Sequence, residues 1–148
     1  MYKIGYTTGV FDLFHTGHLR IIQQAKAQSE HLIVAVSSDD LVFSYKNRYP
    51  IMKLEERMEI VSALTCVDQV VIQDDMNKII AWEKYRFNAH FHGSDWQSSE
   101  LYLDLKKEFE SRGVANIFFQ YTKGTSTSAL KKRIYKLMND DEEGEPVK

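Results

Sequence analysis

Short apolar runs alternate along the chain with longer segments in which apolar residues recur every three or four positions. The run HLIVAVS at residues 31–37 is apolar almost throughout and rich in β-branched residues, which is typical of a strand buried on both faces. None of the four further runs is longer, and each is followed by a polar residue or glycine. The predicted strands are Tyr2–Thr8, His31–Ser37, Gln69–Ile72, Asn88–His92 and Asn116–Tyr121.

The segments between these runs have helical periodicity. In Lys53–Leu64 the apolar side chains of Leu54, Met58, Val61 and Leu64 fall on one stripe, and Pro50 opposes an earlier start. Near the carboxyl terminus, Ser98 and Ser99 can cap one helix. The predicted helices are Thr16–Gln28, Lys53–Leu64, Met76–Arg86, Ser98–Arg112 and Ser126–Met138.

Alternating strands and helices predict an α/β fold, a Rossmann-like open and mostly parallel sheet with helices on both faces. We expect one domain over residues 1–138, followed by an acidic tail, NDDEEGEPVK (139–148), without large apolar residues and therefore disordered. Ligands of such sheets bind beyond the carboxyl ends of the strands. Three segments follow strand ends there: 9–18, 93–96 and 122–128.

Composition narrows the classes of partner. The chain has 148 residues, 43% of them hydrophobic and 27% charged, with a formal net charge of −2, so nothing favours nucleic acid or an anionic membrane as partner. The single Cys66 excludes an internal disulfide and a multi-cysteine metal site. No secretory signal pattern and no apolar run of about 20 residues is present. We therefore expect a cytoplasmic protein that does not insert into membranes.

The segment GVFDLFHTGH (Gly9–His18) joins the first strand to the first helix. His15 and His18 are three residues apart with Gly17 between them, so two imidazoles and several free backbone N–H groups converge at a helix start, where anions are favoured. The chain has neither of the glycine-rich motifs of P-loop and dinucleotide-binding proteins. From these residues alone, a phosphate site, half of a metal site and a packing role for either histidine all stay open.

Three segments resemble the signatures of the cytidylyltransferase family, in the nucleotidyltransferase superfamily that carries HxGH. GVFDLFHTGH resembles GxFDxxHxGH, and YTKGTSTS (Tyr121–Ser128) resembles RTEGIST[ST]. HGSDW (His92–Trp96) resembles the GDDW element of glycerol-3-phosphate cytidylyltransferases. The order is that of the family, and the resemblance spans Tyr2 to Ile134. It implies the HxGH nucleotidyltransferase fold.

The resemblance also implies site residues. His15, His18 and Lys46 match the catalytic positions, where the histidines bind the triphosphate and stabilise charge at the α-phosphorus. Arg48, Tyr121 and Lys123 are weaker candidates for the acceptor or its phosphate. The matched nucleotide-binding positions are Gly9, Val10, Phe11, Asp12, Gly17, Arg57, Asp95, Trp96, Thr122, Gly124, Ser126, Thr127 and Ser128.

Each assignment has a structural alternative. Lys46 and Arg48 fit a solvated basic loop, Arg57 fits a surface helix position, and Asp95 with Trp96 fits a capping Asp beside a core Trp. Asp12 fits a residue that orients the turn, and Ser126 fits a helix cap as well as a phosphate ligand.

Departures from the family pattern concern substrate identity. Tyr121 replaces the family Arg, Lys123 replaces its Glu, and Ser94 replaces the first Asp of GDDW. An arginine that would neutralise phosphate charge is therefore absent from its usual place, and a lysine lacks its fork of donors.

The function that the resemblance implies is transfer of CMP from CTP to a small phosphorylated alcohol such as glycerol 3-phosphate. The products would be a CDP-alcohol, a wall or capsule precursor, and pyrophosphate. Mg²⁺ is expected with CTP, without assigned protein ligands, and a homodimer is expected as in the family. The alternatives are an ATP-using adenylyltransferase of the same superfamily and a non-catalytic nucleotide-binding regulatory module.

Overall fold

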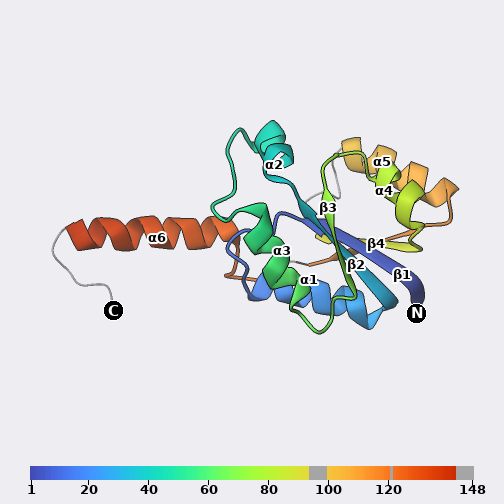
Figure 1. The fold of residues 1–148 in the computed structure, drawn as a ribbon, viewed down its shortest axis with the longest axis horizontal. Coiled ribbons are helices and arrows are strands. Elements are labelled where there is room, and N and C mark those ends of the chain that lie inside the picture. The colour runs from blue at the N-terminus through green and yellow to red at the C-terminus, as the bar shows by residue number, and fades with distance from the viewer. Residues whose placement is uncertain (94–99, 121, 143–148) are drawn as a thin grey trace.

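The computed structural model describes residues 1–93, 100–120 and 122–142. Its core is a five-stranded, wholly parallel sheet with the order β3-β2-β1-β4-β5 (Figure 1). The predicted α/β class and Rossmann-like topology are confirmed. The strands are β1 (Tyr2–Gly9), β2 (Ser29–Ser37), β3 (Gln69–Gln73), β4 (Ala89–Gly93) and β5 (Ala115–Phe119). The helices are α1 (Thr16–Ala27), α2 (Asp39–Lys46), α3 (Leu54–Ser62), α4 (Lys78–Tyr85), α5 (Glu100–Ser111) and α6 (Thr127–Glu142).

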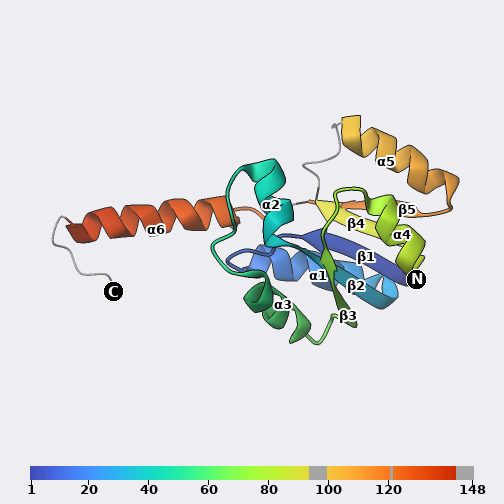
Figure 2. The ribbon, with the colours of Figure 1, turned by 45° about the horizontal axis from the view of Figure 1, so that its top comes forward.

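Two hydrophobic cores cover the two faces of the sheet. Alternate residues of β2 point to opposite faces, so Leu32 and Val34 join the core under α1 and α3, whereas Ile33 and Ala35 join the core under α4 and α5. Figures 1 and 2 show the two helix pairs on opposite sides of the sheet. The stripe predicted on α3 is confirmed, since Val61 is fully buried in the first core.

The helix α2 was not predicted. Its start is fixed by Ser38, whose hydroxyl oxygen accepts the backbone N–H of Leu41 at 3.1 Å. Its end is fixed by Asn47 in the left-handed conformation (φ 55°). The helix has eight residues and buries only Leu41 and Val42, so its apolar periodicity is too short to show in the sequence.

The helix α6 extends away from the sheet (Figures 1 and 2). It continues to Glu142, four residues beyond its predicted end at Met138, and the expected disorder of the acidic tail stays a prediction. The acidic segment contains no proline or glycine before Gly144, and nothing in the chain stops the helix at Met138. Residues 143–148 lie outside the described part of the chain.

The central strand β1 has β2 on one side and β4 on the other. After β1 the chain forms β2 and then β3 on one side of β1, and it later forms β4 and then β5 on the opposite side. The direction in which strands are added to the sheet therefore reverses at β1. In open α/β sheets this reversal opens a crevice at the carboxyl ends of the strands. The HxGH segment follows β1 directly and therefore lies at this crevice.

Candidate active site

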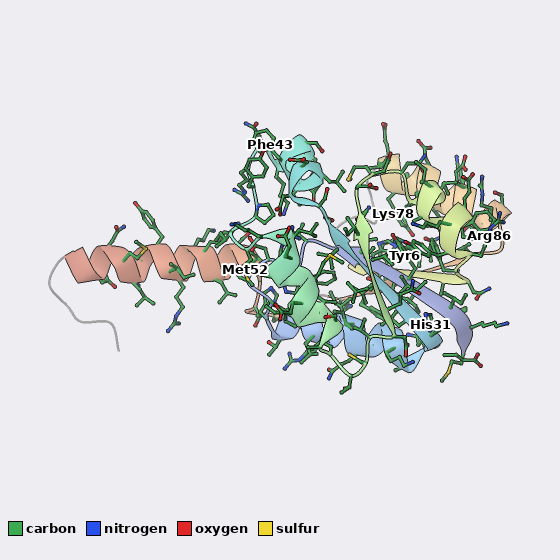
Figure 3. All side chains as sticks on the ribbon, viewed as in Figure 1. Tyr6, His31, Phe43, Met52, Lys78 and Arg86 are labelled. Atoms are coloured by element: carbon green, nitrogen blue, oxygen red, sulfur yellow. The ribbon has the colours of Figure 1, made fainter. Side chains whose placement is uncertain are left out.

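A cleft of about 880 Å³ lies at the carboxyl ends of β1 to β4. One end is lined by His18, Lys46 and Thr127, and the other end by residues of α4, β4 and α5. Figure 3 labels Lys78, the first residue of α4, which lines this second end. The predicted site residues that line the cleft are Gly9, Val10, Phe11, Asp12, His18, Lys46, Arg48 and Thr127.

The turn between β1 and α1 is tightly held. Phe11 (φ 55°) and Leu13 (φ 49°) both have left-handed backbone conformations, which cost roughly 1 kcal/mol each for residues with a side chain. Burial of the Phe11 ring offsets this strain. The carboxylate of Asp12 accepts the backbone N–H groups of Ile51 (2.8 Å) and Met52 (2.9 Å). Asp12 thus fixes the turn against the chain that precedes α3.

The two HxGH histidines form the start of α1. His15 is the residue that caps the helix, and its Nδ1 accepts the backbone N–H of Gly17 at 3.0 Å. The backbone N–H of His15 donates in turn to Nδ1 of His18 at 3.2 Å, which completes a reciprocal capping box. The two rings stack with their centroids 3.8 Å apart.

This arrangement fixes the tautomers of both rings. Because each Nδ1 accepts a backbone N–H, the proton of each neutral imidazole is on Nε2. Both Nε2–H groups are therefore donors that point away from the helix backbone. His15 Nε2 lies 3.4 Å from Oγ1 of Thr127, whose hydroxyl donates to the backbone carbonyl of Asp12 at 3.0 Å.

Both histidines are neutral at pH 7. Burial lowers the pKa of His15 below its ordinary value. For His18, burial and then the neighbouring His15 lower the pKa to about 4, against the opposing charge of Asp12. The rings consequently act on an anion as hydrogen-bond donors, and not as fixed positive charges.

Gly17 is required by close packing. A Cβ atom at this position would lie 2.8 Å from Cε1 of the His15 ring and 3.4 Å from the backbone oxygen of Thr125. Any side chain would displace the ring of His15. Gly9 is similarly close to the ring of Phe11, with a minimum distance of 2.8 Å.

The positive charge of the site comes from Lys46, Arg48 and Lys131. All three line the cleft, and Nζ of Lys131 lies 3.8 Å from a carboxylate oxygen of Asp12. The pKa of Lys46 is lowered by partial burial first and then by the charges of Arg48 and Lys131, against the attraction of Asp12. Around Asp12 these three cations favour an anionic ligand. The remaining charged residues of the cleft lining are Lys78, Asp75, Asp104 and Glu108.

Arg57 is buried and is not among the residues that line the cleft, so its predicted contact with the nucleotide stays a prediction that this geometry does not favour. Its side chain is 0% exposed, and it donates to the backbone carbonyls of Val10 (2.7 Å), Ser37 (2.8 Å) and Met52 (2.9 Å). Its remaining contact is an ion pair with Asp39 at 2.6 Å. Arg57 therefore ties α3 to the carboxyl ends of β1 and β2.

The other predicted residues have different placements. Ser126 caps α6, since its Oγ accepts the backbone N–H of Ala129 at 3.0 Å. Gly124 has a left-handed conformation (φ 79°) in open space. The predicted site residues in the described ranges that do not line the cleft are His15, Gly17, Arg57, Thr122, Lys123, Gly124, Ser126 and Ser128. Ser94, Asp95, Trp96 and Tyr121 lie outside the described residues.

The basic cleft residues that sequence reasoning missed are Lys78, His90, His92 and Lys131. Lys131 lies one helical turn after Thr127, a spacing that could have indicated a shared face. The two histidines of AHFHG alternate within a buried strand, where a polar residue needs a partner or a function.

A protein-held metal is not supported by the described residues. No group of three His, Cys, Asp or Glu side chains in the described ranges could hold a metal ion. The oxygens of Asp12 accept N–H groups, and Asp39 pairs with Arg57. The donor set thus fits a Mg²⁺ ion carried by nucleotide phosphates better than one held by carboxylates, and the predicted Mg²⁺ stays a prediction.

None of the helices in the described ranges is long and apolar enough to cross a membrane.

Comparison with known proteins agrees with this geometry. The cytidylyltransferase-like family model matches residues 6–133. The bifunctional protein HldE of Helicobacter pylori (strain P12) is 32% identical over 139 residues, 93% of this chain and 29% of that protein. HldE of Hyphomonas neptunium is 34% identical over 130 residues, 86% of this chain and 26% of that protein. The chain therefore spans less than a third of the length of these relatives.

Two solved structures share the fold. The lipopolysaccharide core biosynthesis protein of Thermoplasma volcanium has a TM-score of 0.72 at 21% identity, covering 83% of this chain and all of that chain. The pantoate-beta-alanine ligase of Francisella tularensis, complexed with beta-gamma ATP and beta-alanine, has a TM-score of 0.62 at 17% identity. The match covers 93% of this chain and 72% of that chain.

The HxGH capping box, the cluster of Lys46, Arg48 and Lys131 in the cleft and the parallel sheet together fit a nucleotidyltransferase. The chain belongs to the cytidylyltransferase-like family. Its activity class is nucleotidyl transfer, as the resemblance implied.

Proposed function

We propose that the chain transfers AMP from ATP to a phosphorylated sugar, with a heptose phosphate as the leading acceptor, and releases pyrophosphate. The observation that carries the choice of class is the Nε2–H donor of His18, which lines the cleft with Lys46, Arg48 and Lys131, while Nε2 of His15 lies 3.4 Å from Oγ1 of the lining residue Thr127. The choice of ATP and a sugar follows the similarity to HldE proteins over 93% of the chain. It replaces CTP and glycerol 3-phosphate as the leading expectation.

The geometry supports an in-line displacement without a covalent enzyme intermediate. A phosphate oxygen of the acceptor attacks the α-phosphorus of the nucleotide, a new P–O bond forms, and the bond to pyrophosphate breaks. The acceptor phosphate is already ionised near neutral pH, so no strong general base is needed. His15 and His18 donate hydrogen bonds to phosphate oxygens, and positioning and charge neutralisation supply the rate enhancement.

The cations have a separate role in this scheme. Lys46, Arg48 and Lys131 hold the β- and γ-phosphates as the negative charge moves onto the departing pyrophosphate. Thr127, hydrogen-bonded to the carbonyl of Asp12, brings the start of α6 against the HxGH turn. A magnesium ion on the triphosphate would supply further charge neutralisation when bound.

CTP as the nucleotide is the second candidate. GVFDLFHTGH matches the GxFDxxHxGH pattern without a mismatch, and this favours the cytidylyl branch of the family. The departures at Tyr121, Lys123 and Ser94 argue against a glycerol-3-phosphate acceptor, since they concern the segments that follow β4 and β5.

The test is pyrophosphate release by the purified chain with ATP or CTP. Each nucleotide is paired with heptose 1-phosphate, other sugar 1-phosphates and glycerol 3-phosphate, and products are identified by mass. We expect the highest kcat/KM for ATP with a sugar phosphate. Preference for CTP with glycerol 3-phosphate would replace the proposal with the second candidate. Nucleotide binding without turnover on any acceptor would indicate a regulatory module.

A further inference from the structure

Buried polar atoms without hydrogen bonds gather at the end of the cleft opposite the HxGH turn. Both ring nitrogens of His90, Nε2 of His92 and the side-chain amide of Asn116 are buried without a hydrogen-bond partner among the described residues. His90 is 2% exposed and His92 is 9% exposed. Buried polar groups are normally hydrogen-bonded, and a cluster of exceptions requires an explanation.

The sheet brings these groups together. His90 and His92 are two residues apart on β4, so their side chains share the face covered by α4 and α5, and their ring centroids are 4.7 Å apart. Asn116 is the register partner of His90 on the adjacent strand β5. Both histidines line the cleft, as does Lys78 from the start of α4.

The surroundings keep the rings neutral. Burial lowers the pKa of His90 well below its ordinary value, assisted by His92 and Lys78, while the neighbouring Asn116 carboxamide partly opposes the shift. Burial also lowers the pKa of His92 to about 4, with Lys78 contributing in the same direction. A neutral imidazole has one N–H donor and one acceptor nitrogen. In His90 both ring nitrogens are without a partner among the described residues, whereas in His92 only Nε2 is, and a hydrogen bond with the backbone of Gly93 opposes the lowering of its pKa.

Structural need alone does not account for polar side chains here. His90 packs against Phe109 (centroids 5.3 Å apart) and lies 6.2 Å from the ring of Tyr6, and His92 lies 3.8 Å from the ring of Phe118. An aromatic residue without polar atoms would fill either position without leaving a hydrogen bond unmade. The two histidines therefore lower the stability of the fold, and their presence points to a functional role such as ligand binding.

We propose that His90 and His92, with Lys78 beside them, form the subsite that binds the hydroxyl-bearing carbon skeleton of the acceptor. Hydroxyl groups both donate and accept, so they complement a pair of neutral imidazoles. The phosphate of the same acceptor then reaches toward the HxGH end of the cleft, where the cations lie. The proposal rests on the proposed nucleotidyl transfer to a phosphorylated sugar, and it adds the residues that select the sugar.

The test compares the variants His90→Phe and His92→Phe with His31→Phe, a matched control near the amino end of β2 (Figure 3), away from the cleft. For both cleft variants we expect the KM for the sugar phosphate to rise about tenfold or more, because hydroxyl groups lose their partners. We expect the KM for the nucleotide to stay within about twofold. The Tm of His90→Phe should be equal to or above that of the wild type, which a merely structural histidine would not produce.

A conservative variant separates recognition from shape. His92→Gln keeps one donor and one acceptor and is expected to recover part of the acceptor affinity that His92→Phe loses. An acceptor KM within twofold of wild type in both phenylalanine variants would overturn the proposal. A rise in the nucleotide KM alone would also overturn it, since the base or ribose would then occupy this end.

A measurement of sugar-phosphate binding in the absence of nucleotide tests the subsite separately from the proposed nucleotidyl transfer. The sugar phosphates of the activity panel are titrated calorimetrically into wild type and His92→Phe without nucleotide. Binding to wild type that weakens in the variant supports the subsite even if turnover is not seen. Equal binding to both proteins contradicts the subsite. Nucleotidyl transfer itself is tested separately by the release of pyrophosphate.

Discussion

At the scale of single residues, the HxGH histidines act through different ring atoms. Their Nδ1 atoms accept backbone N–H groups and stabilise the helix start. This leaves Nε2–H of His18 at the cleft for a ligand, whereas Nε2–H of His15 lies beside Oγ1 of Thr127. Gly17 makes the arrangement possible, since a Cβ there would lie 2.8 Å from the ring of His15. The structural and chemical roles of one side chain can therefore be separated by substitution.

The variant His15→Asn makes that separation. An asparagine oxygen can accept the Gly17 N–H as Nδ1 does, and asparagine is a good capping residue, so the helix start should persist. The distal N–H donor is lost, and we expect turnover to fall by roughly 10²-fold with Tm nearly unchanged. Steady-state kinetics and thermal unfolding check this, with His31→Asn as control. Near-normal turnover would remove His15 from the catalytic assignment.

At the scale of elements, α3 and α6 are attached to the site by buried polar contacts. Sequence patterns predicted α3 and its apolar stripe, but they could not show which way Arg57 points. Its neighbours Glu55, Glu56 and Glu59 are charged, which is typical of a solvated face. The carbonyls that hold Arg57 come from β1, β2 and the chain before α3, and only the folded sheet brings them together.

Arg57→Met is accordingly expected to destabilise the fold. It leaves three backbone carbonyls and Asp39 without their donor, which costs about 3 kcal/mol or more. Urea unfolding measures the loss, with the exposed Glu59→Met on the same helix as control. A variant of unchanged stability with a raised nucleotide KM would restore the nucleotide-facing assignment.

The first turns of α6 supply a cation that the motif comparison did not identify. Lys131 lies in the cleft and contacts Asp12, whereas its neighbour Lys132 is exposed. Lys131→Met should raise the KM for the nucleotide about tenfold through the loss of one phosphate contact. Lys132→Met should leave it unchanged. Equal effects of the two variants on KM would show only a general loss of positive charge.

At the scale of the whole molecule, hydrophobic periodicity predicted the sheet, its parallel class and the ligand edge. It did so because buried strands and amphipathic helices have different repeats. The helix α2 escaped because it buries two residues only. The subsite of His90 and His92 was not predicted, because a short strand with alternating histidines does not reveal that three of their four ring nitrogens are buried without a partner among the described residues.

Four histidines have lowered pKa values, and the three with the larger shifts, which exclude His15, contribute most to the dependence of stability on pH. Burial lowers the pKa to about 4 for His18 and His92, and well below its ordinary value for His90. Between pH 6.5 and 4 the unfolded chain binds protons that the folded chain does not, so stability falls as the pH falls through this window.

We expect the Tm to fall by about 10 °C from pH 7 to pH 4.5, and by less in His90→Phe, which removes one of the three groups. Thermal unfolding followed by circular dichroism measures both. A Tm that is constant across this window, or an equal fall in the variant, would contradict buried neutral histidines.

The most direct test of nucleotidyl transfer at the HxGH cleft is ³¹P NMR of one reaction containing the chain, ATP and a sugar phosphate. The account predicts that pyrophosphate and a new sugar–nucleotide diphosphate form in equal amounts, and that neither forms with His18→Ala. Release of orthophosphate with ADP would contradict it, because the bond broken would then be at the γ-phosphorus.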